Sequence, residues 1–530
     1  VNVGIDPEFL PSTPMLQNDQ TPLVLAADAG SVSRITVESA EAVAISAGED
    51  VRNVRVVAKN LSDVAMSSVT AGRDIFQPTL REQLIFSDNG SATRPRNFGA
   101  IRTGSVSSQL GLLVDGGGDF VVTSGRDIDL GVSQGVVSRG GLVDTRLEPL
   151  SGASLTVLAG ATNRSAPLDL LATFTSAELL NAAIVDALNG SESAAALAEL
   201  EAAAQSDYIA PTQAALSGYL TELTSNGVLA PSDADDLTRF AALPDSYQIV
   251  FATKTYFDIT EVAGRAGQLV FADAASNALF PGGGQGDFSS PLSTVQTQDD
   301  GQINLATPYG SANTGLTGLA GISDDFKSDR DLGIIAFRSG AANAYVADDY
   351  FVNSTRFFAQ GGGNVLIYAR NGNIDAGRGA KSVADFEDPV PEYDRFGNFS
   401  DRPPLEVAGS GIRSTAPPGV PPGDALLFAP GGVINAGDAG IGSDGGLVAV
   451  ANQIIGADNI SVSGPSSVTT SNSSVTVDAG STDVAAAATR AASAAAEQAV
   501  QQAAENKAAE QAVQKPKLAT VDVDVLSFGE

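Results

Sequence analysis

The chain has 530 residues, and 43% of them are hydrophobic, which is enough for a sizeable core. Lys and Arg total 30 against 62 Asp and Glu, and the net charge of −32 repels phosphate backbones, so we expect no nucleic-acid partner. The absence of Cys and His excludes thiolate nucleophiles, zinc–thiolate sites and any Ser-His-Asp triad. We therefore expect a protein that is not an enzyme and has no cofactor, unless it binds calcium.

The start of the chain shows no targeting signal. It begins at Val1 rather than Met, and no charged segment followed by an apolar stretch comes after it. This pattern indicates a processed protein or a part of a longer precursor. No uncharged run of 18 apolar residues lies outside the Ala-rich C-terminal region, so we expect no transmembrane segment.

A recurring phrase in residues 1–162 indicates a repeat architecture. Residues 45–51 (ISAGEDV), 69–75 (VTAGRDI) and 122–128 (VTSGRDI) share a β-branched residue, Gly, a charged residue, Asp and a second β-branched residue. Each phrase predicts a short strand that runs into a Gly turn, whose backbone the Asp can bond. The first two copies are 24 residues apart, which is the spacing of a β-solenoid rung. Residues 1–162 therefore predict stacked solenoid rungs.

Residues 163–245 have a helical pattern instead. Thr175 and Glu178 have the spacing of a capping box, and apolar residues at helical spacing follow them. Further helical stretches lie at 194–204, 211–223 and 232–242. We predict either a helical insertion between rungs or a cap that covers an open end of the solenoid.

Residues 246–480 return to the rhythm of short strands. Apolar runs are followed by Gly and Asn, which tolerate the positive φ of tight turns, for example in 365–377 and 427–437. We predict that the solenoid continues here, because several stacked units bury a continuous core. Residues 382–424 interrupt the rhythm with many Pro, Asp and Arg, and they predict a long surface loop.

The C-terminal region contains two predicted elements. Residues 481–516 are dominated by Ala, Gln and Glu, which predicts a long helix that ends before Pro516. Residues 517–530 include VDVDVL at 521–526, whose strict alternation predicts a terminal β-strand. Such a strand can add to a sheet edge of its own chain or of a neighbour.

Several Gly-rich phrases carry a family resemblance. They are 364–368 (NVLIY), 372–381 (GNIDAGRGAK), 409–413 (GSGIR), 418–424 (PGVPPGD) and 429–441 (APGGVINAGDAGI). Through them, the stretch from about 247 to 464 resembles the C-terminal domain of bacterial filamentous haemagglutinin family exoproteins, and the repeat phrases near residues 71 and 124 resemble solenoid repeats of the same exoproteins. The resemblance implies a mainly β fold built on a right-handed parallel β-helix, export across the outer membrane, and an adhesin-like role.

Candidate site residues are few. Three acidic pairs recur at about the interval of a rung, and stacked carboxylates repel one another unless cations such as calcium lie between them. These pairs are Asp299–Asp300, Asp324–Asp325 and Asp348–Asp349. The alternative, which we favour, is a set of solvated turns on different faces. Residues 282–287 (GGGQGD) miss the spacing of calcium-binding repeats and predict a flexible turn.

Arg73 and Arg126 occupy equivalent positions in the repeat phrase. Each stands directly before an Asp, namely Asp74 and Asp127. We expect each arginine to pair locally with that Asp or to cover turn carbonyls, and we assign neither a ligand role.

The function we predict is structural and extracellular. The protein would be an adhesin domain or a self-assembling subunit of a filament or surface layer, at the bacterial outer surface or released from it. It would act by multivalent contact with a host or cell-surface ligand, and would self-associate through the solenoid ends or the terminal strand. A carbohydrate-active β-helix enzyme, either a polysaccharide lyase or a hydrolase, is the alternative, although 6% aromatic residues and no Trp disfavour a sugar cleft. A ligand-binding exoprotein that reports to a surface signalling system is a third hypothesis.

Overall fold

The fold is known from a computed structural model in which most of the chain up to residue 471 is described. Contacts divide the chain into two units, Val1–Ala479 and Gly480–Glu530, and all described residues belong to the first. The described residues are 21–78, 110–140, 152–188, 194–315, 332–378, 384–386, 390–393, 399–402 and 406–471. The Ala-rich helix predicted at 481–516 and the strand predicted at 517–530 lie outside them.

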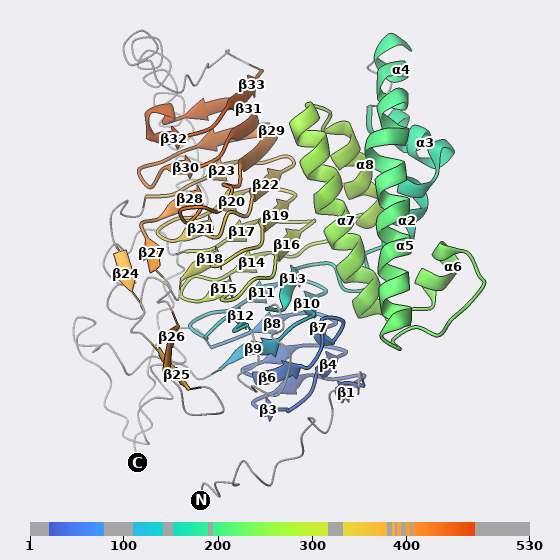
Figure 1. Ribbon diagram of the computed structural model, residues 1–530, viewed down its shortest axis with the longest axis vertical. Coiled ribbons are helices and arrows are strands. Elements are labelled where there is room, and N and C mark those ends of the chain that lie inside the picture. Colours follow the sequence, from blue (N-terminus) through green and yellow to red (C-terminus); the bar gives the residue numbers. More distant parts are fainter. Residues whose placement is uncertain are drawn as a thin grey trace, which may run out of the picture. The chain divides into compact units, whose positions relative to one another are not determined.

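The described part of the chain is mainly β, as predicted, with one 19-stranded and one 10-stranded parallel sheet. The chain contributes one strand to each of three columns in turn and then repeats this order. Thus β4, β5 and β6 follow β1, β2 and β3 and pair in parallel with β1, β2 and β3, respectively. We call each passage through the three columns a rung. This arrangement is consistent with a β-helix or solenoid (Figure 1).

The 19-stranded sheet contains the first two columns. Column 1 contains β1 (Leu23–Ala27), β4 (Val43–Ala47), β7 (Met66–Ala71), β10 (Asp119–Ser124), β13 (Ser154–Leu158), β16 (Ile303–Thr307), β19 (Ala342–Val346), β22 (Val365–Ala369), β29 (Ala425–Asn435), β31 (Leu447–Ile455) and β33 (Ser466–Thr470). Column 2 contains β2 (Val32–Ser33), β5 (Val51–Arg52), β8 (Ile75–Phe76), β11 (Ile128–Asp129), β14 (Phe288–Ser289), β17 (Ala312–Asn313), β20 (Tyr350–Phe351) and β23 (Ile374–Asp375), and it continues into the second halves of β29 and β31.

The 10-stranded sheet is column 3. It contains β3 (Thr36–Glu38), β6 (Arg55–Asn60), β9 (Gly111–Gly116), β12 (Val136–Ser138), β15 (Thr294–Thr297), β18 (Gly333–Ala336), β21 (Arg356–Ala359), β28 (Gly411–Ser414), β30 (Ile441–Ser443) and β32 (Ile460–Val462). Two antiparallel pairs lie apart from the columns, β24 (Ala384–Phe386) with β27 (Glu406–Ala408), and β25 (Val390–Tyr393) with β26 (Phe399–Arg402).

The core lies between the three columns and follows from the alternation of side chains along each strand. In β4, Val43, Ile45 and Ala47 point inward and are buried, whereas Ser46 is exposed. The same inward positions in successive rungs form one apolar cluster that runs from Val32 to Ile454. Stacking therefore buries apolar surface that a single rung would leave in water.

A helical layer interrupts the rungs between β13 and β14. It contains α2 (Pro167–Thr175), α3 (Ala177–Leu188), α4 (Ala194–Ala203), the π-helix η3 (Ala204–Ile209), α5 (Ala210–Ser225), α6 (Asp236–Ala241), α7 (Asp245–Ala266) and α8 (Val270–Leu279). One 3-10 turn, η5 (Ala457–Asn459), lies elsewhere, between β31 and β32. The chain segments that lead into and out of the helical layer are in contact, since a Cβ on Gly286 would lie 2.6 Å from the Cα of Gly160.

The predicted end of the helical region at residue 245 is wrong, because α7 and α8 extend it to Leu279. The sequence of α7 is rich in Thr, Tyr, Phe and Ile, which favour strands. Residues from Tyr247 to Gly264 are buried on several sides of this helix, so packing between two layers overrides the local preference.

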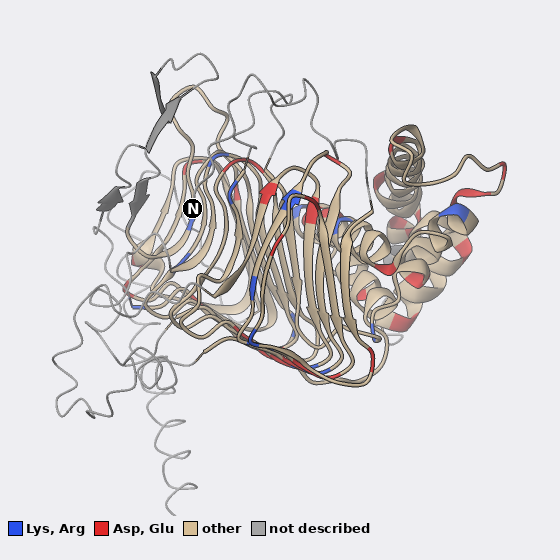
Figure 2. Ribbon diagram, turned by 90° about the horizontal axis from the view of Figure 1, so that it is seen from below, with Lys and Arg blue, Asp and Glu red and all other residues tan. Residues whose placement is uncertain are grey.

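The helical layer covers one side of the stack and not an end of it, so the insertion was the correct alternative and the cap was wrong. Figure 2 looks along the axis of the stack and shows the helices beside the rungs. Helix α7 contacts β7, β10, β16, β29 and β31. Its 22 residues at ~1.5 Å per residue measure about 33 Å. The seven strand spacings from β7 to β31 measure about 34 Å at ~4.8 Å each, so one helix runs along eight rungs.

The predicted surface loop at 382–424 is interrupted by a strand of the stack. β28 (Gly411–Ser414) pairs in parallel with β21 and β30, and Ile412 points into the core. A single inward apolar residue between Gly and Arg leaves too short a pattern to predict a strand.

Candidate functional site

A ladder of hydrogen bonds runs along the corner between columns 1 and 2. At each rung a side-chain oxygen accepts a hydrogen bond from the backbone N–H of the equivalent residue one rung further on. The acceptors are Ser31, Asp50, Asp74, Asp127, Asp287, Ser311, Asp349 and Asn373, each bonded to the amide of the next member and the last to Val433, over 2.7–3.3 Å. We call this the corner ladder. It satisfies backbone donors at the turn and sets the register of the rungs.

Arginines neutralise the N-terminal part of the corner ladder. Arg73 pairs with Asp50 of the preceding rung, with Nη2 2.8 Å from Oδ2, and Arg126 pairs with Asp74 of the preceding rung. The predicted local pairing with Asp74 and Asp127 is therefore wrong, because the ion pairs cross between rungs. Burial alone would raise the pKa of Asp50, but hydrogen bonds from Arg73 and Arg52 and their positive charge lower it below 3.8 overall.

The described calcium candidates lie at two different corners. Asp299 and Asp300 occupy the turn between β15 and β16, where Asp299 pairs with Arg338 at 3.5 Å and Asp300 accepts a hydrogen bond from Ser339. Asp348 and Asp349 lie between β19 and β20, and Asp349 belongs to the corner ladder. These two pairs are therefore not stacked on one edge.

The remaining acidic candidates do not extend this set. Asp324 and Asp325 lie outside the described residues. Asp287, from the phrase at 282–287, continues the corner ladder after the helical layer. Across the described ranges, no group of three or more acidic side chains is placed to hold a metal ion. Calcium binding stays a prediction.

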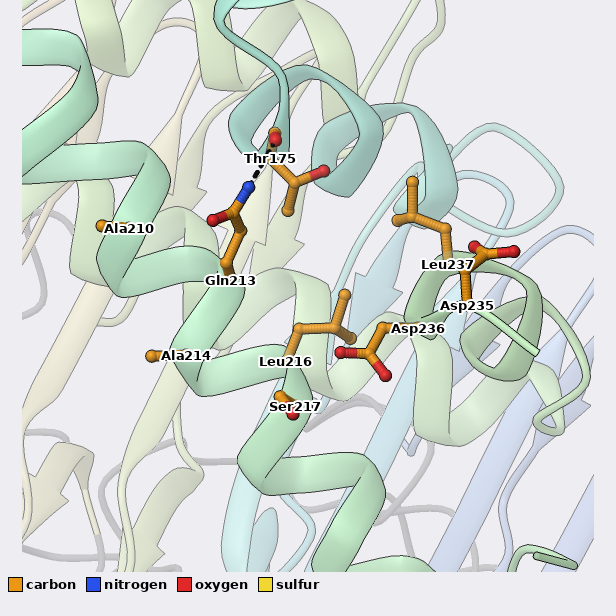
Figure 3. Close-up of a pocket in the computed structure, with 9 residues that line it drawn as sticks. All are labelled: Thr175, Ala210, Gln213, Ala214, Leu216, Ser217, Asp235, Asp236 and Leu237. Atoms are coloured by element: carbon orange, nitrogen blue, oxygen red, sulfur yellow. Dashed lines mark hydrogen bonds between the residues drawn. The ribbon is translucent and has the colours of Figure 1, made fainter. Parts of the chain in front are cut away.

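A pocket of about 660 Å³ opens on the helical layer (Figure 3). The end of α2, the first half of α5 and the start of α6 line it, with Thr175, Ala210, Gln213, Ala214, Leu216, Ser217, Asp235, Asp236 and Leu237. Gln213 donates a hydrogen bond to the Thr175 carbonyl over 2.8 Å and holds α5 against the end of α2.

The two carboxylates of the pocket already have partners. Asp235 caps α6 by accepting hydrogen bonds from the N–H and the hydroxyl of Thr238, and these bonds lower the pKa of the carboxyl. Asp236 pairs with Arg239 at 3.2 Å. The pocket thus offers small apolar walls and ionised acceptors, which suit a cationic or hydrogen-bond-donating group but form no nucleophile–base pair.

Polar bonds fix the helical layer to the C-terminal rungs. Asp273 of α8 accepts a hydrogen bond from the Tyr368 hydroxyl over 2.7 Å and pairs with Arg370 at 2.9 Å. Arg265 of α7 pairs with Asp424. These partners are separated by about a hundred residues or more in the sequence, so no local pattern could have predicted them.

The two ends of column 1 differ in polarity. On β1, Leu23, Val24 and Leu25 are 43%, 64% and 38% exposed, so that the first described strand presents an apolar edge. On β33 (Ser466–Thr470), the outward residues are Ser467 and Thr469. The N-terminal edge is therefore the more apolar of the two.

A bilayer-spanning helix is not found in the described ranges. No single helix there is both long and apolar enough to cross a membrane. Helices α2 and α3 meet the length and composition requirement only as a pair, which is bent by 107°.

Comparison with known proteins gives a family match in the C-terminal rungs. Residues 362–471 match the family model described as filamentous haemagglutinin family outer membrane protein. No curated protein and no solved structure matches the chain. The matched segment contains β22, β29 and β31, together with the last bond of the corner ladder, from the Val433 amide to Asn373. The predicted resemblance is confirmed there, since residues 362–471 are similar to the filamentous haemagglutinin family of outer membrane proteins.

Proposed function

We propose that the protein is a structural, adhesin-like surface protein of a bacterium, whose rungs form a right-handed parallel β-helix. The observation that carries the proposal is the family match, because the matched segment is continuous with the other rungs. β22 inside the match pairs in parallel with β19 before it and with β29 after it. The description of the family supports a location at the outer membrane or cell surface.

The proposed mode of action is multivalent contact. Every inner rung is bonded to two neighbours by its strands, and those from β4 to β22 are also bonded by the corner ladder, which makes the stack stiff. A stiff stack would hold its turns at intervals of ~5 Å, so that weak contacts with a ligand on a host or another cell act together.

Self-association through the ends of the stack is part of the proposal. The apolar edge of β1 supports it, because Leu23 and Leu25 are exposed there and β4 is the one described strand that pairs with β1. Two partners fit this edge, the terminal strand predicted at 521–526 of a neighbour or the last rung of a neighbour. The product would be a filament or a surface layer.

The test is negative-stain imaging and sedimentation of the protein over a range of concentrations. We expect polymers that grow with concentration, and we expect Leu25→Lys to abolish them because it places a charge in the junction. The control is Val185→Lys on α3, where the side chain is 51% exposed and away from the edge. Deletion of residues 518–530 distinguishes the two candidate partners. Polymers that still form without the terminal strand would require contact between the first rung of one molecule and the last rung of another.

A protein that stays monomeric at every concentration would show that self-association is wrong.

We also propose that the protein does not catalyse a reaction, because the pocket carboxylates are engaged and the sequence has no His or Cys. Release of unsaturated or reducing sugars from acidic polysaccharides would instead establish the lyase or hydrolase alternative.

A further inference from the structure

The first rung leaves core positions uncovered on β1. Leu23 and Leu25 occupy inward positions, because the register of β1 with β4 places them beside buried residues of the core. These core partners, Val43 and Ile45, are buried because β4 lies between β1 and β7 and pairs with both. Among the described residues, β4 is the one strand that pairs with β1, and both leucines are exposed. The edge of β1 therefore carries the side chains of an inner strand, but no second neighbour buries them there.

The residues before β1 repeat its apolar pattern one rung earlier. Leu23 aligns with Val43, an interval of 20 residues, and the same interval before β1 falls on residues 3–6 (VGID). It brings the apolar residues Val3 and Ile5 to the two exposed leucines. Gly and Asp alternate with them, as in a strand that has one buried and one solvated face. Residues 3–6 therefore match the edge of β1 in both interval and phase.

The connection from residues 3–6 to β1 has the length that a rung needs. Residues 3–6 lie outside the described part of the chain, which begins at residue 21. Parallel neighbours need a crossover of about a dozen residues or more. Residues 28–42 make this crossover from β1 to β4, and residues 7–22 are one residue longer. Residues 3–6 can therefore reach the edge of β1 within the same molecule.

The turn after β1 is not built for a complete rung before it. In the next three rungs a glycine starts this turn, and a Cβ on Gly48, Gly72 or Gly125 would lie 2.1–2.2 Å from a carbonyl oxygen of the preceding rung. By the register of β1 with β4, the equivalent residue after β1 is Asp28, whose Cβ would overlap the backbone of a complete preceding rung. A strand that stops at Pro7, which has no N–H to donate, avoids this overlap and ends the stack.

We propose that residues 3–6 add to β1 as a lone parallel strand of the same molecule, and that this strand covers Leu23 and Leu25 in the monomer. Burial of the two leucines provides the driving force, as stacking does elsewhere in the core. The added strand itself is independent of self-association. Its consequence rests on the proposed function, because a neighbour that associates through β1 must first displace residues 3–6.

The test of the added strand is disulfide formation in the full chain, which contains no native cysteine. Gly4→Cys and Val24→Cys are register partners in the proposed pairing, and neighbouring strands lie ~4.8 Å apart, within the Cα separation of disulfides. We expect oxidation in dilute solution to link this pair within single molecules, as seen by mass spectrometry of the digested monomer. The control combines Gly4→Cys with Ala44→Cys on β4, which lies one strand beyond Val24 and should not form the link.

Displacement predicts how residues 3–6 affect assembly. Ile5→Lys places a charge at the covered edge, so it should release the added strand and lower several-fold the concentration at which polymers form in the sedimentation assay. Removal of residues 1–20 should have the same effect. The matched control is Gln17→Lys, which adds the same charge outside residues 3–6 and should leave that concentration unchanged.

Absence of the link within single molecules would overturn the added strand. A link found only between molecules would do so as well, because it would assign residues 3–6 to the β1 edge of a neighbour. Polymers of Ile5→Lys that form at the same concentration as those of the native chain would refute the competition. A chain that never forms polymers would refute self-association instead, and the link would then decide the added strand alone.

Discussion

Asp74 connects two rungs through a single buried carboxylate. Its Oδ1 accepts a hydrogen bond from the Asp127 amide over 3.1 Å, and its other oxygen pairs with Arg126. Removing the acceptor would leave that amide without a partner inside the corner. Corner residues of this kind therefore contribute to the register as well as to stability.

We expect Asp74→Ala to lower the free energy of unfolding by roughly 2–3 kcal/mol, because it leaves a buried N–H unsatisfied and removes the partner of Arg126. Asp74→Asn keeps an acceptor oxygen and should cost less than half as much. The midpoint of urea denaturation, followed by circular dichroism, measures both variants. Equal losses for the two variants would mean that charge, and not the amide bond, stabilises the corner.

The sequence predicts the presence of this Asp but not its partner. The phrase at 69–75 correctly predicts a strand, a Gly turn and an Asp that bonds backbone. A bond within the turn and a bond to the next rung need the same residue types, so the pattern cannot distinguish them. The cross-rung pairing of Arg73 with Asp50 was missed for the same reason.

At the scale of elements, α7 depends on one close approach to the stack. Gly264 packs against the ring of Phe428, and a Cβ at Gly264 would overlap that ring. Phe428 is fully buried among the helices and column 1, so it has little room to move. Glycine is therefore required here by the packing partner, although it is a poor helix former.

We expect Gly264→Ala to destabilise the protein by about 1–2 kcal/mol, because overpacking outweighs the gain in helix propensity. Gly218→Ala on α5 is the matched control, since a Cβ there meets no atom within 4 Å and should stabilise by up to ~1 kcal/mol. Thermal unfolding of both variants provides the measurement. If Gly264→Ala is also stabilising, the contact with Phe428 is not a constraint.

The prediction of helices from sequence succeeded for α3 and failed at the end of this layer. Apolar residues of α3 have helical spacing as predicted, but the predicted capping box is wrong, because Thr175 ends α2 and Ser176 accepts the hydrogen bond from the Leu179 amide. In α7, Thr, Tyr and Phe dominate the buried surface because the helix packs between other helices and column 1. The helical conformation of α7 is therefore decided by tertiary contacts, which cannot be read from a single sequence.

At the scale of the whole described unit, the matched segment and the helical layer stabilise each other. The outward side chains of Leu366, Tyr368, Leu426 and Phe428 lie inside residues 362–471 and are buried against helices from outside that range. A chain cut to the matched range would expose this apolar face to water.

We expect a fragment of residues 362–471 to aggregate or to bind a hydrophobic dye, whereas a fragment of residues 152–471 should stay soluble. Threonine at the four outward positions should restore solubility to the short fragment, because it removes the apolar face and suits a strand. Size-exclusion chromatography compares the three chains. A short native fragment that is monomeric and folded would show that the helical layer is dispensable for this segment.

The large-scale architecture was predictable where the sequence repeats itself. The repeat phrases predicted stacked parallel strands, and the Gly-rich phrases near 372 and 431 predicted the family whose model matches residues 362–471. The placement of the helical layer was not predictable. Its contacts join residues such as Tyr247 and Val64, which are far apart in the sequence and share no pattern.

The touching ends of the helical layer have a consequence for protein engineering. The chain leaves the stack at Gly160 and returns at Gly286, and the ladder bond from the Asp287 amide to Asp127 resumes directly. The free-energy cost of closing an inserted segment depends mainly on how near its ends lie and only weakly on its length. The connection between Gly160 and Gly286 already accommodates a whole helical layer. We therefore expect it to be an insertion site at which a foreign domain can replace that layer without shifting the strands on either side.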